Sequence, residues 1–275
     1  MPPSLREALP YEELPLGALD PARIEALRRY RPAAGRRQTI LPDGRMDLVA
    51  HALRDAAGRI TAVTLAIAGP ADRPGTVTHR TALWSVGVRF QLGWGGACLG
   101  LNPATLVNRV LAGPAAEQAL GPLALPVLAA TETEGLQAAL ATAAAALARR
   151  AGPAPATSPS QARALQALRW LRQHPGAPLH ALCAALAVPE RTLRRDVLAA
   201  VGLPLRSLAG ILRFQRAMAW VQRGHPPSLA DLAHEAGYAD QAHMTRQFRQ
   251  FRQFRQFRQF GGFTPALPQQ VPVVA

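Results

Sequence analysis

Two short pairs of amphipathic helices, each broken by a tight turn, dominate the C-terminal part of the chain. Apolar side chains within 178–187 recur at the spacing of one helix face, and a short turn leads to a second helix over 190–201. The same pattern returns over 228–236 and from 240 onward. Both repeats have helix–tight turn–helix spacing, so the region is predicted to be entirely helical.

Two further helices complete this region. An amphipathic helix is predicted over 161–173, and a spacer helix over 205–223 separates the two pairs. At about 1.5 Å per residue the spacer is about 28 Å long. One turn of a DNA duplex is about 34 Å, so the spacer could hold two helices of one chain in successive major grooves.

The N-terminal region has a mixed pattern. We expect a short helix over 22–30. Strands are predicted over 37–41, 46–53, 59–68 and 76–92, and helices over 97–100, 103–110, 114–120 and 133–150. The predicted fold is therefore an α+β N-terminal domain followed by an all-α C-terminal domain with two helix-turn-helix units joined by a long helix.

A stretch rich in proline and small residues separates the two regions. It covers 151–160 and is predicted to be a linker. The predicted organisation is an α+β sensor or regulatory domain over 1–150, the linker, a double helix-turn-helix domain over 161–268, and a tail over 269–275.

Arginine supplies all of the basic charge. The chain has 31 Lys plus Arg residues and no lysine among them, for a net charge of +14. Residues 161–275 hold 15 arginines and 5 acidic residues, a net charge of +10. The planar guanidinium can donate two parallel hydrogen bonds to a phosphate or a guanine. The charge therefore favours a nucleic-acid partner, although a solvated basic face accounts for it equally well.

The second helix of the first pair has one apolar and one basic face. Leu193, Val197 and Leu198 form the apolar side. The opposite side carries three arginines: Arg191, Arg194 and Arg195. Three arginines on a short helix that follows a tight turn are well placed to reach a major groove.

The second pair has clear boundary signals. Ser228 is expected to cap its first helix with Asp231 three residues on, and Gly237 can adopt the left-handed conformation that ends it. The following helix should bury Met244 and Phe248. Its exposed side shows Gln241, Thr245 and Arg246. Glutamine and arginine are the residue types that read adenine and guanine edges.

Specific sequence motifs connect these units to a known family. One runs from Gly237-Tyr238 to Arg246-Gln-Phe248-Arg249, with a trailing Gly262-Phe-Thr-Pro265. Together with Leu179-His-Ala-Leu182 and Arg191-Thr-Leu193-Arg-Arg195, these residues resemble the AraC/XylS family of transcription regulators. The resemblance covers roughly 165–267 and implies sequence-specific binding to double-stranded DNA.

The resemblance also implies which residues contact DNA. The family's base-reading residues correspond to Arg191, Arg194, Arg195, Gln241, Ala242, Thr245 and Arg246. Ala242 can only pack against a thymine methyl, because it has no hydrogen-bonding side chain. Arg206 and Arg249 are candidates for phosphate contacts.

The N-terminal region is similar to an uncharacterised sensor-like domain that is often fused to this module. The matching stretches include Leu41-Pro-Asp-Gly44, Ala68-Gly-Pro70 and Gly87-Val-Arg-Phe90. We therefore expect a regulator whose further partners are RNA polymerase and a small-molecule effector of unknown identity. The sequence does not decide between monomer and homodimer or between activator and repressor. Two cysteines give no disulfide framework, and no signal peptide or membrane span is recognised, so a cytoplasmic location is expected.

An enzymatic alternative rests on one cysteine. Some DNA alkylation-repair methyltransferases carry the same helical module, and Cys98 would be the acceptor residue here. The reactive-cysteine motif of those enzymes, with proline before and His-Arg after, is absent. The sequence therefore predicts no enzyme, no cofactor, no catalytic residue and no metal site.

An Arg-Gln-Phe repeat over 246–260 departs from the family pattern. About two such units are expected, so 252–260 has the character of an insertion. Residues three apart on a helix differ by about 300°, so the phenylalanines drift by about 60° per unit. Phe248 and Phe251 are expected to pack, whereas some of the later ones would face water. In one interpretation, the inserted arginines contact phosphates. In the other, a tandem duplication has impaired docking of the last helix. If DNA binding is impaired in this way, the protein would be a regulator that acts by protein contacts.

Deletion of 252–260 distinguishes these interpretations. If a duplication only lengthened the chain, the deletion should leave binding to the DNA upstream of the protein's own gene unchanged or stronger in a gel-shift assay. Clearly weaker binding would instead show that the insertion contributes phosphate contacts.

Overall fold

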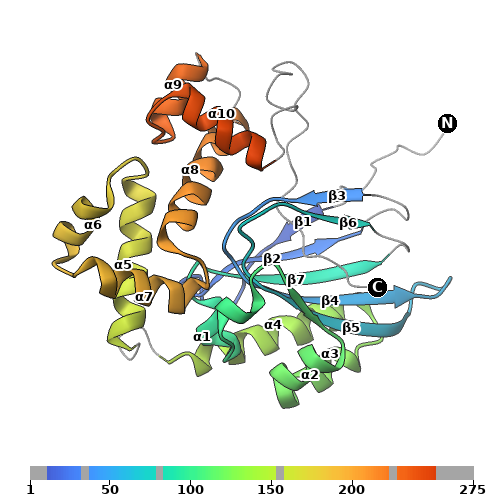
Figure 1. Cartoon of the computed structure of the whole chain (residues 1–275). Coiled ribbons are helices and arrows are strands. Elements are labelled where there is room, and N and C mark those ends of the chain that lie inside the picture. The colour runs from blue at the N-terminus through green and yellow to red at the C-terminus, as the bar shows by residue number, and fades with distance from the viewer. Residues whose placement is uncertain (1–10, 32–36, 79–82, 153–157, 223–227, 252–275) are drawn as a thin grey trace, which may run out of the picture.

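The computed structural model describes residues 11–31, 37–78, 83–152, 158–222 and 228–251 (Figure 1). Strands with helices packed beside them form the N-terminal half, and helices alone form the C-terminal half. The predicted fold class, an α+β domain followed by an all-α domain with two helix-turn-helix units and a long connecting helix, is confirmed.

The strands of the N-terminal half form two antiparallel sheets. Their bounds are β1 Tyr11–Leu14, β2 Ile24–Tyr30, β3 Arg37–Ile40, β4 Asp47–Arg54, β5 Ile60–Ala68, β6 Gly75–Thr78, β7 Trp84–Phe90 and β8 Val110–Ala112. The larger sheet has the order β1-β2-β7-β4-β5-β8, and β3 pairs with β6 in a second, two-stranded sheet.

One face of the larger sheet is apolar and is covered by helices. Alternate residues of the central strands, such as Leu48 and Ala50 of β4 and Val88 of β7, are fully buried on this face. The helical segments are α1 Gly95–Leu99, the 3-10 helix η1 Pro103–Leu106, α2 Pro114–Leu120, the 3-10 helix η2 Gly121–Leu123, α3 Ala124–Leu128 and α4 Thr133–Arg150. Helix α4 packs against the sheet through a stripe of Leu136, Leu140, Ala144 and Leu147.

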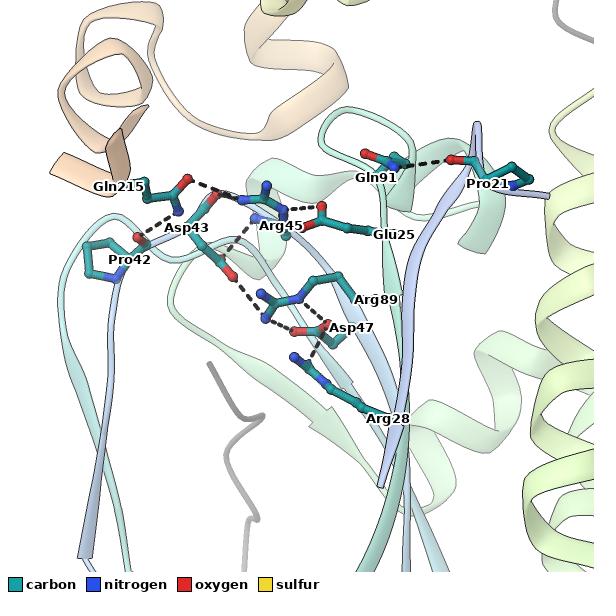
Figure 2. Close-up of polar contacts among 10 residues, drawn as sticks. All are labelled: Pro21, Glu25, Arg28, Pro42, Asp43, Arg45, Asp47, Arg89, Gln91 and Gln215. Atoms are coloured by element: carbon teal, nitrogen blue, oxygen red, sulfur yellow. Dashed lines mark hydrogen bonds and ion pairs between the residues drawn. The ribbon is translucent and has the colours of Figure 1, made fainter. Parts of the chain in front are cut away.

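The opposite face of the same strands is charged and also buried. Arg89 of β7 and Asp47 of β4 are register partners, and two guanidinium nitrogens each lie 2.9 Å from a carboxylate oxygen of Asp47. Arg28 of β2 approaches Asp47 at 2.8 Å, and Asp43 approaches Arg89 at 2.9 Å. Figure 2 shows these four side chains converging. Burial alone would raise the pKa of Asp47, but Arg28 and Arg89 outweigh it and hold that pKa below its ordinary value.

The helices of the C-terminal half pack around one core. Their bounds are α5 Pro159–Gln173, α6 Leu179–Leu186, α7 Glu190–Val201, α8 Leu205–Gln222, α9 Leu229–Glu235 and α10 Gln241–Gln250. These agree with the predicted helices to within a few residues. No individual helix in the described part of the chain is long and apolar enough to cross a membrane, although the bent pair Glu190–Val201 and Leu205–Val221 passes the same test together.

Several predictions for the N-terminal half were wrong. The segment predicted as a helix over 22–30 is strand β2, because its apolar residues fit a bulged strand paired with both β1 and β7. The helix predicted over 103–110 stops at η1, and Asn108 then takes a positive φ of 56° before β8 begins. The long strand predicted over 76–92 is divided between β6 and β7, which belong to different sheets. Strands β1 and β8 and helix α3 were not predicted.

The two halves of the chain are in contact. Gln161 of α5 donates a hydrogen bond from Nε2 to the Gly93 carbonyl oxygen at 2.6 Å. Gly202 lies so close to Pro103 that a Cβ at Gly202 would be 2.6 Å from the Pro103 carbonyl carbon. Residues 153–157 of the predicted linker, and everything after 251, lie outside the described residues. The division into 1–150, 151–160, 161–268 and 269–275 stays a prediction.

The buried charge cluster yields a stability prediction. The substitution Asp47→Asn should lower the free energy of unfolding by about 3–5 kcal/mol, because it leaves Arg28 and Arg89 buried without their shared carboxylate. Urea denaturation measures this. The control Glu12→Gln removes an ion pair with Arg29 that is largely exposed, and should cost no more than about 1 kcal/mol. Equal effects of the two substitutions would contradict the prediction.

Candidate nucleic-acid interface

The first helix-turn-helix unit consists of α6 and α7. Leu182 of α6 and Leu193 and Val197 of α7 are buried against the core, as the apolar pattern predicts. Leu198 was expected on the same face but is 41% exposed, because the buried stripe of α7 turns toward Asp196 and Ala200 instead.

The turn between α6 and α7 uses an unusual residue. Ala187 ends α6 in the left-handed conformation, with φ of 52° and ψ of 40°. A residue with a Cβ costs about 1–2 kcal/mol there relative to glycine. The tight turn that sets the angle of α7 is therefore kept by the surrounding packing rather than by the local preference of the residue.

The three predicted arginines of α7 all lie on its exposed side. Arg194 makes an ion pair with Glu190 one turn earlier, with Nε 2.6 Å from Oε1. Arg195 donates from Nε and Nη2 to Asp196, each at 3.2 Å, yet its side chain remains 69% exposed. The ion pair and the hydrogen bonds hold both guanidinium groups beside the helix, where they remain largely exposed.

A buried carboxylate anchors α7 to α5. Asp196 is 0% exposed. It accepts hydrogen bonds from Ser160 Oγ at 2.8 Å and from Arg163 Nε at 2.7 Å, both on α5. Burial alone would raise the pKa of Asp196, but the hydrogen bonds from Arg163, Ser160 and Arg195 outweigh it and lower that pKa. The position of α7 therefore depends on an ionised carboxylate.

The second unit consists of α9 and α10, and its boundaries are as predicted. Ser228 Oγ accepts from the Asp231 backbone N–H at 3.1 Å, and Gly237 has a φ of 84°. Asp240 caps α10 by accepting from the His243 N–H at 2.5 Å. Met244 and Phe248 are buried. The other side of α10 presents the predicted residues: Gln241, Ala242, Arg246 and Arg249 are exposed, and Thr245 is half-buried.

Aromatic packing fixes α10 on α8. The Phe214 ring of α8 makes edge-to-face contacts with Phe248 at 4.8 Å and with Phe251 at 4.7 Å between ring centroids. Phe248 and Phe251, the first two phenylalanines of the repeat, are both buried, which confirms the prediction that they pack. Residues 252–260, where the later phenylalanines fall, lie outside the described residues.

A close backbone contact joins the turn between α5 and α6 to the turn of the second unit. Gly237, in the turn of the second unit, lies so near Gly176 that a Cβ at Gly237 would be 2.5 Å from the Gly176 nitrogen. Arg213 of α8 reinforces this junction: it donates to the Pro175 carbonyl oxygen at 3.4 Å and lies 5.7 Å from the Tyr238 ring centroid. The relative position of the units is therefore set by direct contact as well as by α8, which Figure 1 shows running between α7 and the α9–α10 pair.

The exposed basic side chains are distributed over both units. Arg206 is exposed in the first turn of α8, next to the end of α7. Near α10, burial and the positive charges of Arg213 and Arg246 lower the pKa of His243. His243 is therefore neutral at pH 7, and the positive charge of this region comes from arginine.

Cys98, the residue of the enzymatic alternative, lies in α1 inside the N-terminal half. It is 2% exposed, and burial raises the pKa of its thiol to about 12. A nucleophilic cysteine needs a thiolate and access to substrate. The Cys98 environment provides neither.

Comparison with known families agrees with this geometry. Residues 182–259 match a helix-turn-helix domain family. The C-terminal domain is an AraC-type helix-turn-helix domain. Residues 24–112 match a domain of unknown function, DUF6597, which spans β2 to β8. A helix-turn-helix domain of the AraC type supports a DNA-binding transcription regulator.

Several solved structures that match are of ToxT from Vibrio cholerae. One is 12% identical, covering 82% of this chain and 93% of ToxT with a TM-score of 0.42. A second is 11% identical, covering 86% and 97% with a TM-score of 0.43. A third, of ToxT bound to an unsaturated fatty acid, is 10% identical, covering 82% and 90% with a TM-score of 0.41. A search of curated proteins found no match.

Sequence reasoning missed the residues that hold the AraC-type units in place. Asp196 gave a readable signal, because it falls on the buried stripe formed by Leu193, Val197 and Ala200. An acidic residue on such a stripe requires a buried partner. The Gly176–Gly237 contact gave no such signal, since it joins residues far apart in the sequence.

The Asp196 network makes a pH-dependent prediction. Asp196→Asn should lower the free energy of unfolding at pH 7 by about 1–3 kcal/mol, because Arg163 and Ser160 lose an ionised acceptor. The folded-state pKa is below the unfolded value of about 3.9, so this contribution is fully present above about pH 4 and is lost as pH falls through the folded pKa.

Urea denaturation of the natural protein and of Asp196→Asn at several pH values measures the difference between their free energies of unfolding. This difference should be the same at pH 7 and pH 5 and should become smaller at lower pH. A difference that widens on acidification would contradict the assigned charge state of Asp196.

Proposed function

We propose that this protein is a sequence-specific DNA-binding transcription regulator that places α7 and α10 in successive major grooves of one duplex. The observation that carries the proposal is the pair of exposed, arginine-bearing helix faces held on one scaffold by α8 and by the Gly176–Gly237 contact. Helix α8 has 18 residues and is about 27 Å long at about 1.5 Å per residue. That length is comparable with one turn of DNA, about 34 Å.

The assignment of roles follows from residue type and position. Arg191, Arg194 and Arg195 on α7, and Gln241, Thr245 and Arg246 on α10, are proposed to contact base edges. Arg206 and Arg249 are proposed to contact phosphates, because Arg206 lies next to the end of α7, Arg249 lies in the last turn of α10, and both are exposed. With a net charge of +14, binding should weaken steeply as salt concentration rises.

We also propose that the N-terminal domain modulates DNA binding. Its loop around Gly44 packs directly on α8, where a Cβ at Gly44 would be 3.2 Å from Leu208 Cδ1. Because α8 connects the two units, a change in this contact would alter their relative position. A transcription regulator must reach chromosomal DNA, so a cytoplasmic location is part of the proposal.

Arg246→Ala is the sharpest test of base reading. Selection from a random DNA library first identifies the preferred site, and fluorescence anisotropy then measures affinity for it. We expect the variant to lose about 1–3 kcal/mol of binding free energy and to relax preference at one base pair, because one bidentate base contact is removed.

The control Arg149→Ala removes an exposed arginine in the last turn of α4, outside both units, and should leave affinity unchanged. A loss for Arg246→Ala that is equal on all sequences would make Arg246 a phosphate contact. Failure of the intact protein to select any sequence would favour a regulator that acts only by protein contacts.

A further inference from the structure

A cavity of about 170 Å³ lies between the two sheets of the N-terminal domain. One water needs only about 10–15 Å³, so this space can hold a small organic molecule. Ile40, Ala68, Pro74 and Val110 give it an apolar wall. Gly69, also in the lining, lies so close to Leu106 that a Cβ would overlap the Leu106 carbonyl oxygen at 2.0 Å, so this side of the wall is tightly packed.

The carboxylates in the cavity lining are buried and already have partners. Asp47 is paired with Arg28 and Arg89, and Asp43 is paired with Arg89. Arg45, which also lines the cavity, is paired with Glu25. Figure 2 shows the contacts that join these three arginines to the three carboxylates. Each of these carboxylates is therefore paired with an arginine, and none is available to bind a cationic ligand.

The positive charge that remains in the lining comes from two arginines. Arg73 follows β5 and Arg109 precedes β8, and the two loops are joined by a hydrogen bond from the Gly69 N–H to the Arg109 carbonyl oxygen at 2.9 Å. Both side chains are exposed, and neither makes an ion pair with a carboxylate of the described residues. The neighbouring Asp72 does not line the cavity, and its carboxylate accepts from Asn108 Nδ2 at 2.8 Å.

We propose that this cavity binds a short-chain carboxylate, with the charged group on Arg73 and Arg109 and the hydrocarbon part against the apolar wall. A guanidinium is the side chain best suited to bind a carboxylate with two parallel hydrogen bonds. An apolar wall with a few convergent polar groups is the usual make-up of a small-molecule site. This inference rests on the proposed function, for which it supplies the chemical class of the effector.

The same lining contacts the helix that joins the two DNA-binding units. Arg45 Nη1 donates to Gln215 Oε1 of α8 at 3.3 Å, and Gln215 Nε2 donates to the Pro42 carbonyl oxygen at 3.4 Å. Figure 2 shows Gln215 lying against the turn that carries Asp43 and Arg45. A ligand that shifts this turn would therefore change a direct contact with α8.

Calorimetry with the full-length protein tests the ligand class. The probes are hexanoate, hexanamide and hexylamine, which share an apolar chain and differ in charge. Hexanoate should bind with a dissociation constant of about 1 mM or below, within the range for so small a molecule, and the other two should bind at least about tenfold more weakly. Hexanoate that fails to bind, or hexanamide or hexylamine that binds as tightly as hexanoate, would overturn the proposal.

Substitutions test the position of the charge. Arg73→Gln and Arg109→Gln should each weaken hexanoate binding about tenfold, the effect of losing one charge-assisted hydrogen bond. Arg149→Gln, an exposed arginine outside the cavity, should leave hexanoate affinity unchanged. Thermal unfolding in the absence of ligand shows that each variant is folded. Unchanged hexanoate binding in both cavity variants would refute the assigned site.

DNA affinity measured with and without saturating hexanoate tests the contact with α8. Hexanoate should change the affinity of the unsubstituted protein for DNA by about fivefold or more. The change should be lost in Gln215→Met, which still binds hexanoate. No change in the natural sequence would refute an effector role for the site. If hexanoate binds but the protein selects no DNA sequence without it, the proposed function fails and the ligand site stands. If the protein binds DNA but not hexanoate, the ligand site fails and the proposed function stands.

Discussion

Burial of helix α8 is the constraint on which the rest of the C-terminal domain depends. Leu208, Ile211 and Phe214 are buried, and the Phe214 ring packs against two further aromatic rings, one in α10 and one at its end. Because protein interiors pack as densely as crystals, a helix held in this way cannot rotate without moving its neighbours. The spacing between α7 and α10 therefore depends on the contacts that α8 makes with its neighbours.

Buried arginine–carboxylate contacts are used in both halves of the chain. Asp196 ties α7 to α5, and Asp47 ties β4 to β2 and β7. Such pairs contribute less net stability than apolar packing of similar volume, but breaking one is costly because the partner charge stays buried. Their geometric demands instead select one arrangement of the elements, which suits a protein that must present side chains to DNA in register. The rigid fork of arginine meets those demands better than lysine would.

The proposed regulation depends on the contact between the halves, which lies between the cavity and α8. The turn that carries Asp43 and Arg45 has the charge cluster on one side and α8 on the other. Coupling of two sites requires that both act on a shared element with more than one arrangement. In the proposed regulation this turn would be the shared element, since its side chains contribute to the cavity lining and to the contact with α8.

The sequence by itself determined the helices of the C-terminal domain, the boundaries of α9 and the exposed arginines of α7 and α10. Helix boundaries and amphipathic faces depend on residues within a few positions of one another, as with Ser228 and Asp231 or Met244 and Phe248. Only the tertiary structure decided that residues 24–30 form a strand, that Asp196 joins α5, and that Gly176 meets Gly237. Strand pairing and buried ion pairs join residues distant in the chain, and the free energy of those contacts exceeds the local preferences that a sequence pattern records.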